Sequence, residues 1–246
     1  MGRQFDSASG HIWKIMYSKI INLLKSKFPK ILSVYYKIRF VVRAIYIKEP
    51  RAHLLWILKR SDKLVHKKFN LNSDSVFFDV GGFEGKYAEK IIEEFDPYTY
   101  IFEPHPLYFE KLQKKFKGNK KVKLFDYALG AKTETAYLTD DFASSSISAD
   151  NSGIKIKVKN FIETVNELKV QKIDLLKINI EGSEYDLLDG LLESNVVKQI
   201  STLKIQFHEN VDNYDFRRNK IRENLSKTHK EVWSYYMVWE CWDLIE

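Results

Sequence analysis

From residue 71 onward, short apolar runs alternate along the chain with segments of helical periodicity. The apolar runs predict strands at 75–80, 98–102, 122–127, 173–180 and 202–207. The segments between them predict helices at 86–95, 107–117, 161–168 and 184–193. Such alternation is typical of an α/β fold in which a parallel sheet carries helices on both faces. We therefore expect a doubly wound, mostly parallel, Rossmann-like sheet over residues 71–246.

Two other parts of this region predict strands outside the parallel series. Residues 136–139 and 154–158 predict an added β pair, placed between the third strand and the helix at 161–168. Residues 231–242, rich in Trp, Tyr and Val, predict a hairpin or one long antiparallel edge strand. The sheet should therefore end in an antiparallel edge.

Residues 1–70 predict a basic helical extension. Apolar residues interspersed with lysines suggest helices at 12–28, ending near Pro29, at 31–47, ending before Pro50, and at 52–68. Their apolar faces are broad. The extension would pack onto the main domain, form a dimer contact, or lie on an anionic membrane or anionic polymer through residues 1–48.

Charge is unevenly distributed along the 246 residues, whose formal net charge is +7. Residues 1–50 hold ten Lys and Arg against Asp6 and Glu49, so the remaining 196 residues hold 30 basic and 31 acidic side chains. A nucleic-acid channel would require a basic face in the main domain. We therefore expect no nucleic-acid partner.

Composition also bears on location. No stretch of ten residues lacks a charge, which argues against a transmembrane helix, and the N-terminus shows no signal-peptide pattern. The one cysteine, Cys241, cannot form an intrachain disulfide and has no partner for a zinc site. We expect a cytoplasmic protein, with a peripheral position at the inner membrane face as the alternative that residues 1–48 allow.

The most informative segment is the turn after the first predicted strand. That strand ends at Asp79, and Gly81, Gly82 and Gly85 follow before the next helix. Glu103 directly follows the second strand, about 20 residues on, where doubly wound folds place an acid for a ribose diol. The glycine spacing differs from the G-x-G-x-x-G of dinucleotide sites, and Asp79 would repel a phosphate. An acid there suits an ammonium group, such as that of S-adenosylmethionine, although an ordinary tight strand–helix turn would also have this sequence.

Further motifs follow in order along the chain. They are the segments 79–85 (DVGGFEG), 102–106 (FEPHP), 127–130 (YALG), 144–146 (SSS), 177–184 (KINIEGSE), 207–209 (FHE) and 238–242 (VWECW). In this ordered set the chain resembles the FkbM family of S-adenosylmethionine-dependent methyltransferases from about residue 71 to the end. Family members often have Asn in place of Phe83 and Asp in place of Asn179.

The residues expected to bind the cofactor lie at the ends of the first three strands. Glu103 would accept from both ribose hydroxyls, Asp79 would hold the loop or meet the ammonium, and Asp126 would accept from the adenine amino group. The alternative for each is a capping acid or a plain strand-end turn. The full expected set is Asp79, Gly81, Gly82, Phe83, Gly85, Tyr87, Glu103, Pro104, Asp126, Tyr127 and Ala128.

The expected catalytic residues follow the fourth and fifth strands. Asn179 and Glu181 should face the transferred methyl group, with Glu181 orienting or deprotonating a hydroxyl, or else capping the next helix. His208 would be the general base or a structural hydrogen-bonding residue. Lys177 would pair with Asp79 or Asp174, and the serines at 144–146 would line the acceptor pocket or be solvated.

The resemblance implies methyl transfer to a hydroxyl oxygen of a small molecule or glycan, with a sugar of a surface polysaccharide or its precursor preferred. The alternatives are N-methylation, methylation of a lipid or polyketide hydroxyl, and a nucleoside-binding module without activity. Some sugar O-methyltransferases use Mg²⁺, which stays an alternative here, but Asn179 and Glu181 supply only one charge. The ligand count does not support a metal, and we name no metal ligands.

Overall fold

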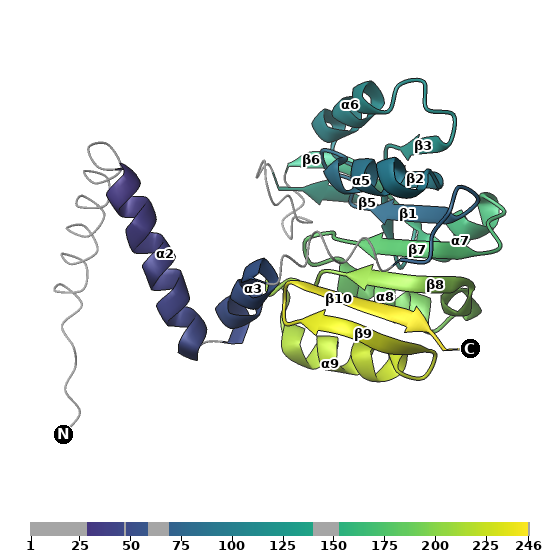
Figure 1. The fold of residues 1–246 in the computed structure, drawn as a ribbon. Coiled ribbons are helices and arrows are strands. Elements are labelled where there is room, and N and C mark those ends of the chain that lie inside the picture. The colour runs from purple at the N-terminus through teal and green to yellow at the C-terminus, as the bar shows by residue number, and fades with distance from the viewer. Residues whose placement is uncertain (1–28, 47, 59–68, 140–152, 246) are drawn as a thin grey trace. The chain divides into compact units, whose positions relative to one another are not determined.

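A computed structural model describes residues 29–46, 48–58, 69–139 and 153–245 (Figure 1). The chain divides into two compact units, Met1–Leu55 and Trp56–Glu246. The division expected from the sequence, a helical extension over 1–70 and a methyltransferase domain over 71–246, stays a proposal. The predicted helix at 12–28, most of the third helix at 52–68 and the serines at 144–146 lie outside the described residues.

Two helices precede the sheet. Helix α2 spans Pro29–Tyr46 and helix α3 spans Lys48–Leu58. Both prolines that the sequence marked as helix ends instead lie in a first turn, where the missing N–H costs no hydrogen bond. The predicted start of the third helix at residue 52 was therefore wrong. No described helix is long and apolar enough to cross a membrane.

The second unit is built on a seven-stranded sheet. Its strands are β1 (Val76–Val80), β2 (Tyr98–Phe102), β3 (Val122–Phe125), β7 (Ile173–Ile178), β8 (Ile200–Ile205), β9 (His229–Tyr235) and β10 (Trp239–Leu244). The spatial order is β3-β2-β1-β7-β8-β10-β9, and β10 alone runs in the direction opposite to the other six strands. The predicted doubly wound sheet with an antiparallel C-terminal edge is confirmed, and residues 231–242 belong to a hairpin.

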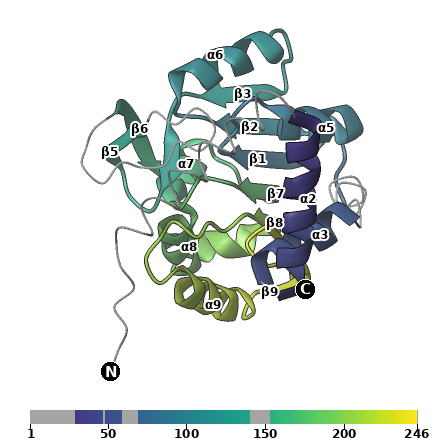
Figure 2. The ribbon, with the colours of Figure 1, turned by 90° about the vertical axis from the view of Figure 1, so that its left-hand side faces the viewer.

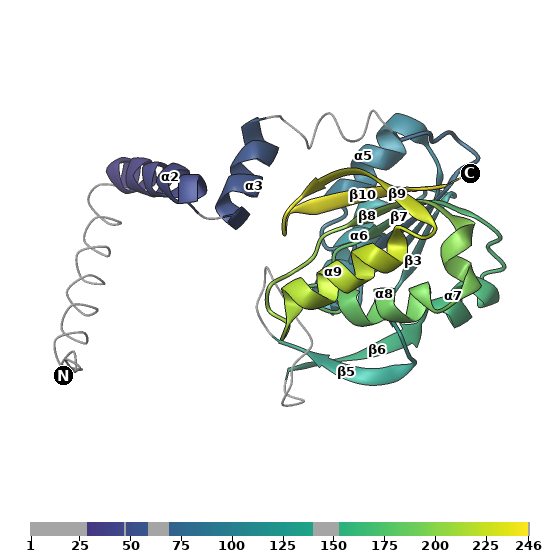
Figure 3. The same ribbon diagram turned by 90° about the horizontal axis from the view of Figure 1, so that it is seen from below.

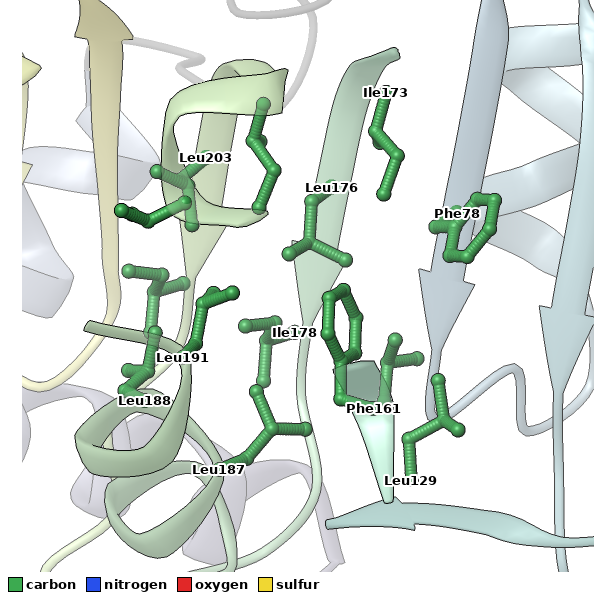
Figure 4. Close-up of a cluster of buried hydrophobic side chains, with 14 of the residues drawn as sticks. Phe78, Leu129, Phe161, Ile173, Leu176, Ile178, Leu187, Leu188, Leu191 and Leu203 are labelled. Carbon is green, nitrogen blue, oxygen red and sulfur yellow. The ribbon is translucent and has the colours of Figure 1, made fainter. Parts of the chain in front are cut away.

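Helices cover both faces of this sheet. Helices α7 (Phe161–Glu167), α8 (Glu184–Leu192) and α9 (Tyr214–Leu225) pack on one face, and α5 (Lys86–Phe95) packs on the other (Figure 3). Helix α6 (Pro106–Lys115) packs on the same face as α5. Alternate residues of each strand point to opposite faces. Phe78 and Leu176 therefore join the α8 core, drawn in Figure 4, whereas Phe77 and Leu175 join the α5 core.

A second, three-stranded sheet lies beside the first. Its strands are β4 (Ala128–Gly130), β5 (Glu134–Leu138) and β6 (Ile154–Asn160), in the order β4-β6-β5. The sequence predicted β5 and β6 as a pair but placed residues 126–127 in the preceding strand. The chain leaves the large sheet at Phe125 and starts β4 at Ala128, so the third strand is shorter than predicted.

The sequence prediction missed helix α9 and a short 3₁₀ helix at Asn195–Gln199. Helix α9 is rich in charged and amide side chains and buries only Arg218, Ile221 and Leu225. Three buried positions in twelve residues give a weak periodic signal, since a helix is recognised from the sequence by a wide apolar stripe.

Candidate cofactor and active site

The candidate site lies where the strand order reverses. Strand β1 pairs in parallel with β2 on one side and with β7 on the other, so the chain leaves β1 in opposite directions. Figure 2 looks onto the carboxyl edge of these strands, with β5 and β6 to one side. Open α/β sheets bind ligands at this edge, in the crevice at the point of reversal.

A cavity of about 360 Å³ lies at this edge. Its volume falls within the range of roughly 300–1,000 Å³ found for small-molecule sites. Residues after three strands line it: Gly81 and Phe83 after β1, Glu103 and Pro104 after β2, and Asn179 and Glu181 after β7. The sequence placed all six of these in the site.

Gly81 lets β1 and β7 approach each other closely. Its φ is +83°, and a Cβ built on it would lie 2.0 Å from the carbonyl oxygen of Asn179. The N–H groups of Gly81 and Gly82 both donate to the Phe102 carbonyl, at 3.0 and 3.1 Å. The turn is thus fixed against both neighbouring strands, and only glycine fits at position 81.

Gly82 and Gly85 have a different role from the one predicted. Neither lines the cavity. A Cβ on Gly82 would lie 2.3 Å from the Ile101 side chain, and one on Gly85 would lie 2.7 Å from that of Leu112. These two glycines make room for packing between the turn, β2 and α6, rather than for the ligand.

Asp79 supports the turn from beneath. Its carboxylate is fully buried and pairs with Lys177 at 2.8 Å, while the Lys177 Nζ donates to the Gly81 carbonyl at 2.6 Å. Burial raises the pKa of Asp79, and Lys177 opposes that rise. Asp79 does not line the cavity, so of its two predicted roles the geometry supports holding the loop. The predicted pairing of Lys177 with Asp79 is confirmed.

Glu103 lies on the cavity with its carboxylate oriented by two backbone amides. Phe83 N donates to Oε2 at 2.7 Å, and His105 N donates to Oε1 at 2.8 Å. Burial raises the pKa of this carboxyl, and the two amides oppose the rise. A carboxylate oxygen can accept more than one hydrogen bond, so both oxygens retain capacity for a diol. His105 also caps α6 by accepting from Leu107 N at 3.2 Å.

The small sheet forms an apolar wall of the cavity. The apolar side chains of this sheet that line the cavity are those of Ala128, Leu129, Leu138, Ile156 and Val158. Only Ala128 was predicted. The alternation of Ile154, Ile156 and Val158 with lysines was the available signal, because it places these apolar side chains on one face of β6.

Besides Asp79, Gly82 and Gly85, three further predicted cofactor residues stand outside the cavity lining. Asp126 lies in a separate depression with Glu110. The Tyr127 ring packs against Phe102 and Phe125, and burial raises its pKa to about 12. Tyr87 lies on the opposite face of the sheet, with its ring 6.0 Å from that of Phe77. The structure therefore does not bring these three side chains to the cavity.

His208 bridges two glutamates next to the cavity. Its Nδ1 lies 3.0 Å from Glu184 Oε1 and its Nε2 lies 3.5 Å from Glu181 Oε1. Burial opposes the imidazolium, but the hydrogen bonds with Glu181 and Glu184 outweigh it and raise the pKa of His208 to about 9. The imidazole is therefore a cation at neutral pH. It does not line the cavity, whereas Glu181 does.

Glu184 ends the motif at 177–184, but the sequence analysis predicted no role for it. It is fully buried, and its carboxylate accepts from Gly182 N at 2.8 Å and from His208 N at 2.8 Å. The carboxylate thus fixes the turn that carries Glu181, whose φ is +50°. Its position as the first residue of α8, after an acid and a glycine, was the only available signal.

Asn179 lines the cavity and has a buried side-chain acceptor with no partner among the described residues. Its Oδ1 is buried and makes no hydrogen bond to any described residue, while its backbone N donates to the Val80 carbonyl at 3.1 Å. A buried acceptor of this kind is costly unless a ligand donates to it. In the described ranges, no group of three or more His, Cys, Asp and Glu side chains is placed to hold a metal ion.

The fold and the site define a class of protein, an α/β enzyme that binds a nucleoside cofactor at the carboxyl edge of its sheet. The model of the FkbM methyltransferase domain matches residues 77–236, and the chain belongs to this family. It is a methyltransferase that uses S-adenosylmethionine. No curated protein matches the chain.

Solved structures with similar folds have little sequence in common with the chain. Fibrillarin, a pre-rRNA processing protein of Methanococcus jannaschii, is 10% identical, with a TM-score of 0.46 over 70% of this chain and 67% of its own. Fibrillarin of Aeropyrum pernix with bound S-adenosylmethionine is 10% identical, with a TM-score of 0.44 over 70% and 67%. An rRNA methylase from Streptococcus thermophilus is 10% identical, with a TM-score of 0.40 over 72% and 90%.

The cavity fits this cofactor. Glu103 is placed to accept from a ribose diol, the apolar wall suits an adenine ring, and the orphan Oδ1 of Asn179 can accept from an ammonium group.

Proposed function

We propose that the protein transfers the methyl group to a hydroxyl oxygen, with a sugar of a surface glycan or its precursor as the acceptor. The observation that carries this proposal is the Glu181 carboxylate on the cavity wall, held by His208 at 3.5 Å. A hydroxyl must lose its proton as it is methylated, and a carboxylate positioned at the site can take that proton.

In this proposal, Glu103, Asn179 and the Gly81 turn hold the cofactor. S-adenosylmethionine, when bound, supplies a methyl group already activated on a sulfonium. The protein then has mainly to position the acceptor, which can contribute up to roughly 7–11 kcal/mol to lowering the barrier.

Glu181 accepts the hydrogen bond of the acceptor hydroxyl and then its proton. His208 acts on Glu181 rather than on the substrate, because a histidine with a pKa of about 9 already carries its proton at neutral pH. Its second contact, with the buried Glu184, fixes the imidazole against the turn. His208 is therefore a positioning residue in this proposal, and not the general base that was one of its two roles expected from the sequence.

The acceptor side of the cavity supports a neutral, hydroxyl-rich substrate. Glu181, Ser183 and Asp186 line it, and Asp186 also pairs with Arg217 at 2.7 Å. Carboxylate and hydroxyl oxygens accept hydrogen bonds from sugar hydroxyls and repel a phosphodiester backbone. The same carboxylates would hold a protonated amine, so N-methylation of an amino group is the second candidate.

The test is a product screen by mass spectrometry. The purified protein is incubated with S-adenosylmethionine carrying an isotope-labelled methyl group and with sugars, nucleotide sugars, cell-surface glycans and matched amino sugars. We expect an ether-linked methyl on a sugar hydroxyl, lost in Glu181→Gln. A labelled methylamine would favour the second candidate, and transfer only to RNA would overturn the proposal.

A further inference from the structure

Helix α2 carries an exposed apolar stripe. Val34, Tyr35, Ile38, Val41 and Val42 expose 55%, 44%, 59%, 46% and 49% of their surface. Successive residues of an α-helix are about 100° apart, so these five side chains fall within an arc of about 120°. Five large apolar side chains at such exposure on one arc are unfavourable in water and indicate a surface that is covered in use.

Basic side chains border this stripe on both sides. The same helical spacing places Lys30 and Lys37 along one edge of the arc, and Arg39 along the other. The helix contains no Asp or Glu. A helix with an apolar stripe between two basic edges has the pattern of one that lies in the plane of a membrane surface.

We propose that α2 binds the surface of a membrane rich in anionic lipids. Its apolar stripe enters the boundary between headgroups and acyl chains, and its lysines and arginines contact the lipid phosphates. The absence of acidic side chains from the helix selects an anionic surface over a protein face of mixed charge. The tyrosine in the stripe, Tyr35, suits the interface, where an apolar ring and a polar hydroxyl are both satisfied.

The proposal is tested by co-sedimentation of the full chain with vesicles. Vesicles of phosphatidylcholine alone are compared with vesicles containing 30 mol% phosphatidylglycerol, a proportion chosen to be roughly that of an anionic membrane surface. We expect binding to the anionic vesicles, weakened by salt, and little binding to phosphatidylcholine.

A matched pair of variants separates insertion from simple charge attraction. Ile38→Glu places a carboxylate in the stripe, whereas Ser33→Glu places the same charge on the opposite, exposed face of α2. We expect Ile38→Glu to weaken binding by at least about tenfold relative to Ser33→Glu, since burial of an isoleucine is lost. The double variant Lys30→Gln with Lys37→Gln should lower the affinity for anionic vesicles by about fivefold per charge removed.

Three results would overturn the proposal. They are no binding of the wild-type chain to anionic vesicles, equal weakening by the two glutamate variants, and a stable dimer in ultracentrifugation that Ile38→Glu converts to a monomer. The last would show that a second copy of the chain covers the stripe. Affinity for S-adenosylmethionine, measured by calorimetry on each variant, confirms that the enzyme remains folded.

Discussion

Gly81 and Asn179 are in such close contact across the ends of β1 and β7 that no side chain fits between them. A Cβ on Gly81 would lie 2.0 Å from the Asn179 carbonyl oxygen and 3.0 Å from its carbonyl carbon. The same Asn179 lines the cavity, and its buried Oδ1 has no hydrogen-bond partner among the described residues. The contact of Gly81 with Asn179 therefore holds the ends of β1 and β7 together and also fixes the position of a residue that lines the cavity.

We expect Gly81→Ala to lower the free energy of unfolding by more than about 3 kcal/mol, because the new Cβ overlaps backbone and the φ of +83° is unfavourable for alanine. Gly118→Ala is the matched control. Gly118 has a φ of +84° but nothing within 4 Å of its Cβ position, so Gly118→Ala should lower the free energy of unfolding by only about 1–2 kcal/mol. Urea unfolding measures both. Equal losses would show that the contact with Asn179 does not matter.

The sequence was a good guide where strand, turn and acid are adjacent in the chain. The turn at Gly81 and the acid at Glu103 could both be predicted, because the carboxyl ends of parallel strands meet at one edge. The sequence could not decide between the two roles predicted for Asp79. Whether that carboxylate faces the ligand or Lys177 depends on the pairing of β1 with β7, which joins residues about a hundred positions apart.

Glu103→Gln should weaken the affinity for S-adenosylmethionine by about 10–100-fold, the equivalent of one or two hydrogen bonds to a charged acceptor. The residue stays close in size, but one of its two oxygens becomes a donor. Glu89→Gln, on the exposed face of α5, makes the same chemical change away from the cavity and should leave the affinity unchanged. Calorimetry measures both affinities. An unchanged affinity in Glu103→Gln would mean that the Glu103 carboxylate binds only the two backbone amides and not the cofactor.

Glu181→Gln should lower kcat by about 10²–10⁴-fold without changing the affinity for S-adenosylmethionine, because it removes the proton acceptor and not a cofactor contact. His208→Gln should lower kcat less, since it loosens Glu181 but leaves the carboxylate. Rate measurements with the acceptor identified by the product screen test both. Two results together would give the histidine a direct part in proton transfer. They are a His208→Gln variant as inactive as Glu181→Gln, and a wild-type kcat that changes with an alkaline pKa which the variant lacks.

The cluster of His208, Glu181 and Glu184 shows what sequence patterns leave out. The sequence placed His208 at a strand end and Glu181 after another, but the contact between them depends on β7 and β8 lying side by side. The protonation of the histidine depends in turn on Glu184, which is buried beneath it. The position of a histidine at a strand end is therefore not enough to identify a general base, because its protonation depends on neighbouring side chains that the sequence does not reveal.

The same cluster should make stability depend on pH. The pKa of His208 is raised from 6.5 to about 9 in the folded protein. Its contribution, at most about 3 kcal/mol, is therefore fully present below pH 6.5 and is lost as the pH rises through 9. Unfolding of the wild type and of His208→Gln at pH 6 and pH 9.5 should show a difference in stability that is larger at pH 6. A difference that did not change with pH would mean that the histidine is not charged in the folded state.

Lys204 is a buried base that the proposed reaction does not use. It is 2% exposed, its Nζ lies 4.4 Å from the centre of the Tyr87 ring and 4.6 Å from that of Trp239, and none of the described carboxylates pairs with it. Burial lowers its pKa from 10.5 to about 7. Between these two values the unfolded chain binds a proton that the folded chain does not, so stability should rise with pH across this window.

Replacement of Lys204 by methionine removes the free-energy cost of burying an amino group while keeping a side chain of similar length. We expect Lys204→Met to raise the free energy of unfolding at pH 7 by about 1–3 kcal/mol and to flatten its rise between pH 7 and 10.5. Lys198→Met, at an exposed position, is the control and should change stability by less than about 0.5 kcal/mol. Urea titrations across this pH range provide the measurement. A less stable Lys204→Met would show that attraction between the ammonium and the two aromatic rings outweighs the cost of its burial.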